Sequence, residues 1–548
     1  FDSPVRVAPT LILVLLAGAL ALPVLMVIGS WTQWNAETAQ ILREMAATVL
    51  PEYLWVTVQL ALMVGLGVVA MGVPAALLVT VFDFPGRRSF EWLLLLPLAM
   101  PAYVTAYAYT DFLQFSGPLQ SWLRASFGLQ GRLLPEVRSV WGAAWVFSFS
   151  LYPYVYLLAR TALVERAPQL MEAARLLGAS LPRRLREVAL PMARPAVAAG
   201  TALALMEVLA DYGVSVYFGI QTFTAGIYKA WLSMDNRIAA AQLATVLLAL
   251  VVLLLWLEQR AQRRLRFASA SAARVGSGEA RPVRLCGRRA ALAWLLCLLP
   301  VLLGFVLPVG FMLRPLSADW SVLPWDRFLG WAWSSVRLGG MTALLALGAA
   351  WLLAFSLRRQ PTLPRRGAVQ LISLGYAVPG AVVVVGLLLP VGWLQARWPD
   401  SGAGAVVTAT VLGLLWAYLV RFVSVALQSV QSGYARVSRS LDESARLLGA
   451  SGLELALRVH WPLLRRAGLA AALLVFVDVM KELPATIVLR PFDTDTLAVV
   501  ANQLARDERL GEAALPSLAL VLVGLVPVIL LSRTLRAERR ASDEAARV

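Results

Sequence analysis

The sequence predicts an all-α integral membrane protein, with about twelve transmembrane helices arranged as two parallel halves of six. Composition is the first observation behind this prediction. Of 548 residues, 59% are hydrophobic and only 15% are charged, against roughly 25% charged in an average soluble domain. A soluble fold could not bury so much apolar surface, whereas lipid accepts it on helices whose backbones are satisfied internally. The expected environment is therefore a lipid bilayer.

The second observation is a series of continuous apolar runs, each long enough to cross a bilayer as a helix of about 20 residues. The runs do not alternate between apolar and polar positions, which excludes a transmembrane β-barrel. The first run is longer than the core of a signal peptide and has no small-residue cleavage site, so it is counted as a helix. The spans are expected near residues 9–31, 55–81, 90–113, 140–163, 195–217, 239–257, 290–313, 336–357, 367–392, 404–427, 467–489 and 512–532.

The third observation is where the positive charge lies. The net charge is +17, and almost all of it is arginine, because Lys229 and Lys481 are the only lysines. In a twelve-helix arrangement the arginine clusters fall in loops on one side, which the positive-inside rule makes cytoplasmic, together with both termini. The charge thus predicts topology, and no nucleic-acid partner is expected. The clusters are Arg87 and Arg88, Arg183 to Arg186, Arg260 to Arg289, Arg358 to Arg366, Arg465 and Arg466, and Arg533 to Arg540.

The chain is expected to divide into two similar halves. The stretch 259–289 is rich in Arg, Ala, Ser and Gly and has little apolar periodicity, which is typical of a linker. It separates a first half, 1–258, from a second half, 290–548. Because six spans, an even number, precede the linker, both halves enter the membrane in the same direction, as a parallel repeat.

A nine-residue phrase recurs at corresponding places in the two halves. Glu172 to Ser180 reads EAARLLGAS, and Glu443 to Ser451 reads ESARLLGAS, 271 positions later. Both copies fall in expected cytoplasmic loops after the fourth span of each half, at 164–194 and 429–466. Each loop is predicted to hold a short helix with two leucines, a Gly-Ala-Ser break, and a second amphipathic segment that a proline stops before the next span. The recurrence indicates that both copies meet the same kind of partner.

At these loops the chain resembles the permease subunits of ATP-binding-cassette (ABC) importers, whose signature is E-A-A, three residues, G, nine residues, I-x-L-P. The second copy has Ser444 in place of alanine and Trp461 in place of leucine, and both copies have valine in the isoleucine place. The first copy fits at Glu172, Ala173, Ala174, Gly178, Val188, Leu190 and Pro191, and the second at Glu443, Ala445, Gly449, Val459 and Pro462.

The resemblance implies the type I permease fold, a bacterial inner-membrane location and transport by alternating access. In that family the loops are coupling helices that dock on a cytoplasmic ATPase, so two ATPase copies are expected. A periplasmic binding protein would deliver substrate to the outer loops, 218–238 and 490–511. The chain has no G-x-x-x-x-G-K-[ST] motif. ATP and Mg²⁺ are therefore expected on the partner ATPase, with no catalytic residue and no cofactor in this chain.

The stretches 206–244 and 477–515 resemble the ferric-iron branch of these permeases, whose members often fuse two halves in one chain. Thiamine permeases are fused in the same way and are the nearest alternative substrate class. An alternative from another class is a twelve-helix secondary transporter driven by an ion gradient. It would explain parallel halves and intramembrane carboxylates, but not two E-A-A loops.

Four carboxylates are candidates for a substrate pathway. Glu207 and Asp211 lie four residues apart in the expected fifth span, and Asp478 and Glu482 repeat the spacing in the eleventh. Ionisable groups inside a span are functional candidates by default, and a hard ferric ion favours anionic oxygen ligands. Transient contacts at these four positions would suit transport. Lys481 could instead neutralise a neighbour, in which case the group would only pin two helices together.

Pro484 is expected to bend the eleventh span, which would release carbonyls toward the pathway.

Tyrosines and an aspartate recur at helical spacing in the third span. Tyr103, Tyr107 and Asp111 would share one face, with Tyr109 turned away. They could form an entry site for iron, but an interfacial aromatic belt explains them more simply.

The remaining metal-ligand residue types give no site pattern. His460 is the only histidine, and a cytoplasmic surface role is expected for it. Cys286 and Cys297 are too few for a disulfide framework and have no metal-like spacing, so both are expected to be inert.

Overall fold

A computed structural model of the chain describes residues 4–32, 36–233, 236–272, 283–318, 320–321, 323–435 and 437–545. Throughout these ranges the secondary structure is helical, apart from one two-residue parallel pairing of β1 (Phe82–Asp83) with β2 (Val283–Arg284). The all-α prediction is confirmed. The chain folds into two compact units, each built from separate stretches of sequence.

The first unit comprises residues 1–46, 226–248 and 325–500. The helix α12 (Arg237–Ala272) begins in this unit and continues into the other one, as does α24 (Leu497–Arg506), while α11 (Phe223–Leu232) begins in the other unit and ends in this one. The remaining elements of the first unit are α1 (Pro4–Gly29), η1 (Ser30–Thr32), α2 (Ala36–Ala47), α15 (Trp325–Arg359), α16 (Leu363–Ser373), η5 (Gly375–Ala377), α17 (Gly380–Arg397), η6 (Pro399–Ser401), α18 (Ala403–Thr408), α19 (Val411–Tyr434), α20 (Arg439–Leu447), α21 (Gly452–Glu454), η7 (Leu455–His460), α22 (Trp461–Lys481) and α23 (Pro484–Leu489).

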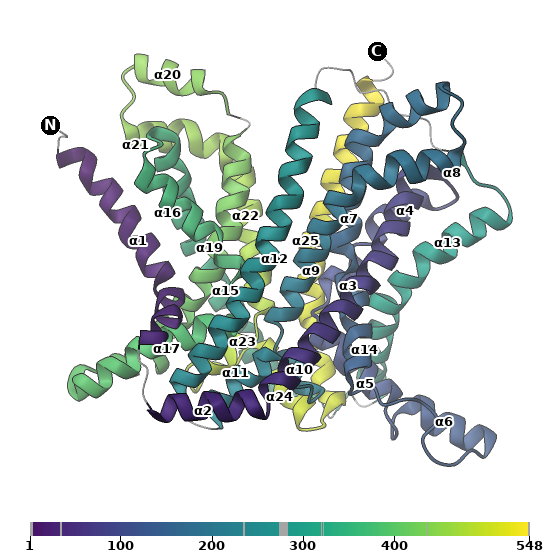
Figure 1. Cartoon of the computed structure of the whole chain (residues 1–548), viewed down its shortest axis with the longest axis horizontal. Coiled ribbons are helices and arrows are strands. Elements are labelled where there is room, and N and C mark those ends of the chain that lie inside the picture. The colour runs from purple at the N-terminus through teal and green to yellow at the C-terminus, as the bar shows by residue number, and fades with distance from the viewer. Residues whose placement is uncertain are drawn as a thin grey trace. The chain divides into compact units, whose positions relative to one another are not determined.

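The second unit comprises residues 47–225, 249–324 and 501–548. Figure 1 labels the main helices of both units. The elements of the second unit are α3 (Leu50–Val81), α4 (Arg87–Leu93), η2 (Leu96–Ala99), α5 (Ala102–Leu113), α6 (Pro118–Phe127), α7 (Val140–Leu176), α8 (Leu181–Arg184), η3 (Leu185–Ala189), α9 (Leu190–Ala210), α10 (Gly213–Tyr217), α13 (Arg288–Val301), η4 (Leu302–Val306), α14 (Leu307–Ala318) and α25 (Leu510–Ala545).

Each unit has a core of three mutually packed helices. These are α15, α19 and α22 in the first unit, and α3, α7 and α9 in the second. Glycines allow the close approach, as is common between membrane helices. A Cβ at Gly200 of α9 would lie 2.7 Å from Cα of Val155 in α7, and one at Gly339 of α15 would lie 2.9 Å from the ring of Phe476 in α22. The cores contain the second, fourth and fifth predicted spans of each half, so the repeat is a structural one.

The first span of each half packs with the core of the other half. Helix α1 lies against α16 and α17 of the first unit (Figure 1), and α13 and α14 lie against α3, α4 and α5 of the second. The last helix, α25, also belongs to the second unit and contacts α14. The compact units therefore do not coincide with the stretches 1–258 and 290–548. Those boundaries describe the sequence repeat and stay a prediction.

Among the described residues, ten helices are long and apolar enough to cross a membrane, or eleven if one bent pair counts as a span. The prediction of about twelve counted α22 as well. That helix carries Arg465, Arg466, Asp478 and Lys481, and it is not one of the ten. The fold is nevertheless that of a multi-pass helical membrane protein.

Two predicted spans are broken at a proline. The third, 90–113, bends by 87° between Ala99 and Ala102, and the ninth, 367–392, is interrupted before α17. The residues before Pro101 and Pro379 are both extended, because the proline ring disfavours helical geometry at the preceding position. Pro101 and Pro379 also have the same backbone angles, φ −58° and ψ 142°.

Three expected connections contain helix. The outer loops 218–238 and 490–511 contain α11 and α24, and α12 extends to Ala272, so the first part of the predicted linker is helical. Residues 234–235 of the first outer loop and 273–282 of the linker lie outside the described residues. Cys286 is exposed, and Cys297 is buried in α13.

Candidate coupling loops and intramembrane carboxylates

The two nine-residue copies end their helices with the same turn. Gly178 and Gly449 have positive φ, +81° and +86°. In the first copy the amide of Ala179 donates to the carbonyl of Ala174, and that of Gly178 donates to Arg175. The second copy has the same two bonds, from Ala450 to Ala445 and from Gly449 to Arg446. This is the Schellman arrangement, in which a left-handed glycine closes the last turn of a helix, as the Gly-Ala-Ser break predicted.

The helices that lead into these turns differ. The second copy lies on a short helix, α20, as predicted. The first does not, because α7 runs without a break for 37 residues from the membrane span to Leu176. Glu172, Ala173 and Ala174 therefore lie at the end of a long helix. The prediction of a separate short helix is wrong for this copy, because α7 continues through Pro168 without a break.

Each turn presents two leucines to the surroundings. Leu176 and Leu177 are 82% and 87% exposed, and Leu447 and Leu448 are 88% and 89% exposed. Single exposed leucines are ordinary, but adjacent pairs this exposed at equivalent places in a repeat indicate a contact surface. Glu172 is half-buried and lies 3.7 Å from Arg175, while Glu443 is exposed. Ala445 and Pro191 are half-buried, and Pro462 is exposed.

The chain returns toward the membrane through a π-helical turn in both copies, η3 in the first and η7 in the second. The amide of Leu190 bonds to Leu185, and that of Trp461 bonds to Ala456, each five residues back. Pro191 and Pro462 follow directly and do not stop the helix, so that prediction is wrong. Proline lacks an amide hydrogen and clashes with the carbonyl four residues earlier, and the wider turn relieves that clash. Such π turns often mark functional sites.

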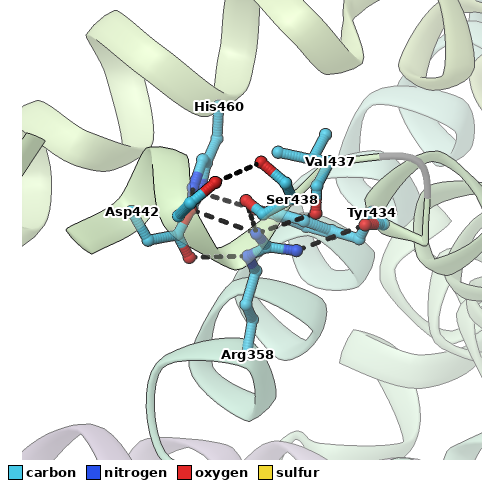
Figure 2. Close-up of polar contacts among 7 residues, drawn as sticks. Arg358, Tyr434, Val437, Ser438, Asp442 and His460 are labelled. Carbon is cyan, nitrogen blue, oxygen red and sulfur yellow. Dashed lines mark hydrogen bonds and ion pairs between the residues drawn. The ribbon is translucent and has the colours of Figure 1, made fainter. Parts of the chain in front are cut away.

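A buried polar cluster lies behind the second copy (Figure 2). The carboxylate of Asp442 accepts two hydrogen bonds from Arg358, at 2.7 and 3.1 Å, and lies 2.9 Å from Nε2 of His460. Arg358 also donates to the carbonyls of Tyr434, Val437 and Ser438. Three of these bonded groups come from different elements, α15, α20 and η7. Bidentate arginine–carboxylate pairs of this kind are strong and fix geometry.

The charge of Asp442 follows from its neighbours. Burial acts to raise its pKa, but the hydrogen bonds and positive charge of Arg358 and the hydrogen bond from His460 outweigh burial, so the pKa lies below its usual range. The carboxylate is ionised at neutral pH and only accepts hydrogen bonds. Because the pKa is lowered by folding, the stabilisation is complete above the ordinary aspartate pKa and is lost as pH falls through the lowered value.

The prediction of a surface role for His460 is wrong. The side chain is 1% exposed, between Asp442 and the hydroxyl of Tyr434, which lies 3.2 Å from Nδ1. Since an ionised carboxylate cannot donate, Nε2 donates to Asp442. Position 460 gave no sequence signal, because a lone histidine in a cytoplasmic loop has no partner until the loop folds.

Two of the four candidate carboxylates lie where helices break. Helix α9 ends at Ala210 and α22 at Lys481, so Asp211 and Glu482 are the first non-helical residues, both with extended backbone. The face-sharing argument, which assumed a continuous helix, therefore does not hold for either pair. Asp211 accepts from the amide and hydroxyl of Ser215. Glu482 accepts from the amides of Ala485 and Thr486 and from the Thr486 hydroxyl.

Glu482 is also a buried ion-pair partner. Its side chain is 1% exposed and lies 3.2 Å from Nη1 of Arg421 in α19. Glu207, Asp478 and Lys481 are half-buried within α9 and α22. Pro484 begins α23 rather than bending α22, and its carbonyl accepts the Tyr228 hydroxyl at 2.7 Å. That carbonyl is therefore engaged within its own unit.

The tyrosines of the third span do not form a lipid-facing belt. Tyr103, Tyr107 and Tyr109 are all buried. The hydroxyl of Tyr107 accepts from Asn502 at 2.8 Å, and that of Tyr109 donates to the carbonyl of Leu303 at 2.6 Å. Asp111 is half-buried. Within the described ranges, no group of three or more His, Cys, Asp or Glu side chains is placed to hold a metal ion.

A duplicated helical core, broken spans and two matching helix-end turns are the architecture expected of a membrane transport permease. Residues 69–267 match the family of the binding-protein-dependent transport system inner membrane component. Over 534 residues the chain is 24% identical to the Fe(3+)-transport system permease protein FbpB 2 of Haemophilus influenzae, covering 96% of this chain and 97% of that protein.

Two further relatives are permeases as well. The chain is 25% identical over 512 residues to the probable ABC transporter permease protein y4fN of Sinorhizobium fredii, covering 88% and 87% of the two chains. It is 29% identical over 235 residues to the sulfate transport system permease protein CysW of Escherichia coli, covering 41% and 77%. Residues 69–267 therefore form a domain of this permease family, and along the rest of its length the chain is similar to ABC permeases, which are generally non-catalytic. These likenesses favour that class over an ion-gradient transporter.

Proposed function

We propose that this permease carries ferric iron from the periplasm to the cytoplasm. The observation that carries the substrate assignment is the likeness to an Fe(3+)-transport permease along nearly the whole of both chains. That likeness includes both halves of the repeat, whereas the likeness to the sulfate permease covers less than half of this chain. Thiamine remains the alternative substrate that the sequence suggested.

The energy for transport comes from separate ATPase subunits in this proposal. The support is the pair of Schellman turns with exposed leucines, Leu176 and Leu177 in one loop and Leu447 and Leu448 in the other. An amphipathic helix end with apolar anchors suits docking in a groove on a partner. Two equivalent turns suit two ATPase copies, each with its own ATP and Mg²⁺, so this chain needs no cofactor of its own.

Within the membrane, we assign Glu207 and Asp478 to the substrate pathway. They occupy equivalent positions of the repeat and are half-buried in helices. Asp211 and Glu482 contribute mainly by accepting hydrogen bonds from the residues that follow the ends of α9 and α22. Lys481 lies next to Glu482 in the sequence. Weak contact with successive carboxylates would let a trivalent cation move on, where permanent ligation would hold it.

The remaining partners follow from the class. A periplasmic binding protein would dock on the segments 218–238 and 490–511. The arginine distribution supports a bacterial inner-membrane topology with both termini in the cytoplasm.

Uptake into proteoliposomes that contain the permease, its ATPase and its binding protein tests the substrate assignment. Labelled ferric ion, thiamine and sulfate would be offered in parallel, with and without ATP. We expect ATP-dependent uptake of ferric ion alone. Glu207→Gln and Asp478→Asn should each lower ferric uptake, while binding of the ATPase stays unchanged. Uptake of thiamine or sulfate without iron would refute the ferric assignment and leave the importer class standing.

A further inference from the structure

We propose that Asp442 is a positioning residue that holds the second ATPase-docking helix, α20, in place. The first docking helix, which is the C-terminal end of α7, needs no such residue. The inference rests on the proposed function of the two loops. It implies that the two docking sites, although alike in sequence, are held by different physical means.

Helix α20 needs a side-chain anchor because it is separated from the preceding helix by non-helical residues. Helix α19 ends at Tyr434, and α20 begins at Arg439. A nine-residue helix is too short to be stable by itself in water, and most of α20 is exposed. Asp442 is its one buried residue. The position of α20 therefore depends on what Asp442 contacts.

Arg358 closes the break from the other side. Its guanidinium donates to the carbonyls of Tyr434, at the end of α19, and of Val437 and Ser438, which precede α20. The carbonyl of Tyr434, in the last turn of α19, has no partner within that helix. The same guanidinium holds Asp442, and His460 joins Asp442 to the returning limb η7. One carboxylate thus links α15, α20 and η7 (Figure 2).

The first copy lacks the aspartate and the histidine at the equivalent positions. Met171 stands where Asp442 does, and Ala189 stands where His460 does. Both are buried, and the end of α7 packs on η3 as α20 packs on η7. Because α7 is continuous, its end is held by the helix itself. An apolar contact therefore suffices in the first copy.

Arg359 extends the asymmetry to the returning limb. A Cβ at Gly452 would lie 2.7 Å from Nη1 of Arg359, so a larger side chain there would displace the arginine. The first copy has Leu181 at the equivalent position. The two last residues of α15 therefore lie against both limbs of the second loop, Arg358 bonded to Asp442 and Arg359 close to Gly452.

A spin label on each docking helix tests the proposal without needing ATPase or substrate. Ala173 and Ser444 are exposed and equivalent in the repeat, so cysteines would be placed there singly after Cys286 and Cys297 are replaced. In Asp442→Asn we expect the label at 444 to become more mobile and the label at 173 to stay unchanged. Met171→Ala is the matched change in the first copy and should leave the label at 173 nearly as it was.

A second variant guards against misfolding. Asp442→Met with His460→Ala installs the two residues of the first copy. This variant should also increase the mobility of the label at 444, because α19 and α20 remain separate helices. Asp442→Glu keeps the carboxylate and should restore much of the ordered signal. In the full transporter we expect Asp442→Asn to lower uptake per ATP hydrolysed about tenfold, with ATPase binding retained. The proposal would be overturned if the label at 444 stayed as ordered in Asp442→Asn and in the Asp442→Met, His460→Ala variant as in the unaltered protein. It would also be overturned if Asp442→Asn increased the mobility of the labels at 173 and 444 equally. Failure of ferric uptake in the unaltered protein would instead refute the proposed function.

Discussion

Replacing Leu447 and Leu448 together by aspartate should abolish ATP-driven uptake while the permease still folds. The two side chains are nearly fully exposed, so the folded chain loses little by the change. A leucine buried on docking contributes about 1.5–3 kcal/mol. Losing two should therefore weaken the ATPase complex at this loop at least about 100-fold, and the new carboxylates add a desolvation cost. ATPase binding and uptake in proteoliposomes measure the effect.

The same change at Leu176 and Leu177 should have an effect of the same size. A transport cycle that needs both ATPases cannot proceed with one docking site lost. Leu363→Asp is a suitable control, because Leu363 is 83% exposed at the start of α16 and belongs to neither docking turn. Near-normal uptake in either double variant would show that the leucine pair is not the docking anchor.

Glu482→Gln should destabilise the folded permease more than any other single change proposed here. The substitution leaves the buried guanidinium of Arg421 without its charge partner, and breaking a buried pair from one side costs about 3–5 kcal/mol. It also weakens the bonds that hold the start of α23. We expect a clearly lower midpoint of thermal unfolding in detergent, with uptake reduced in proportion to the folded fraction.

Asp211→Asn is the matched variant in the other half. Asp211 is half-buried and accepts hydrogen bonds from Ser215, and in the part of the chain that the structure describes no arginine pairs with it as Arg421 pairs with Glu482. The loss should therefore be nearer the about 0.5–2 kcal/mol typical of a helix cap. If Glu482→Gln instead left the unfolding midpoint unchanged and stopped uptake, Glu482 would be a pathway residue rather than a structural one.

Local signals made the two Schellman turns, at Gly178 and Gly449, predictable from the sequence. A glycine after a leucine pair specifies a left-handed helix end through its own backbone freedom, and the surrounding fold is not needed to see it. Repetition at 271 residues then assigned both copies to equivalent places. The helical class followed in the same way from apolar runs, because lipid leaves few other choices for the backbone.

Long-range packing set the features that the sequence did not predict. Nothing near residue 460 indicates that Asp442 and Arg358 will enclose a histidine, since Arg358 is about a hundred positions earlier. The exchange of α1 and α13 between the sequence halves depends on which core each helix meets. Pro191 and Pro462 suggested helix ends because a π turn has no sequence signature of its own.

Photo-crosslinking from the two docking turns to the ATPase tests the central claim most directly. A photoreactive amino acid would replace Leu177 in one preparation and Leu448 in another, with Leu363 as the control position. We predict that both turns crosslink to the ATPase in the assembled transporter and that the control position does not. Crosslinking at neither turn, or equally at all three positions, would contradict the account of two specific docking sites.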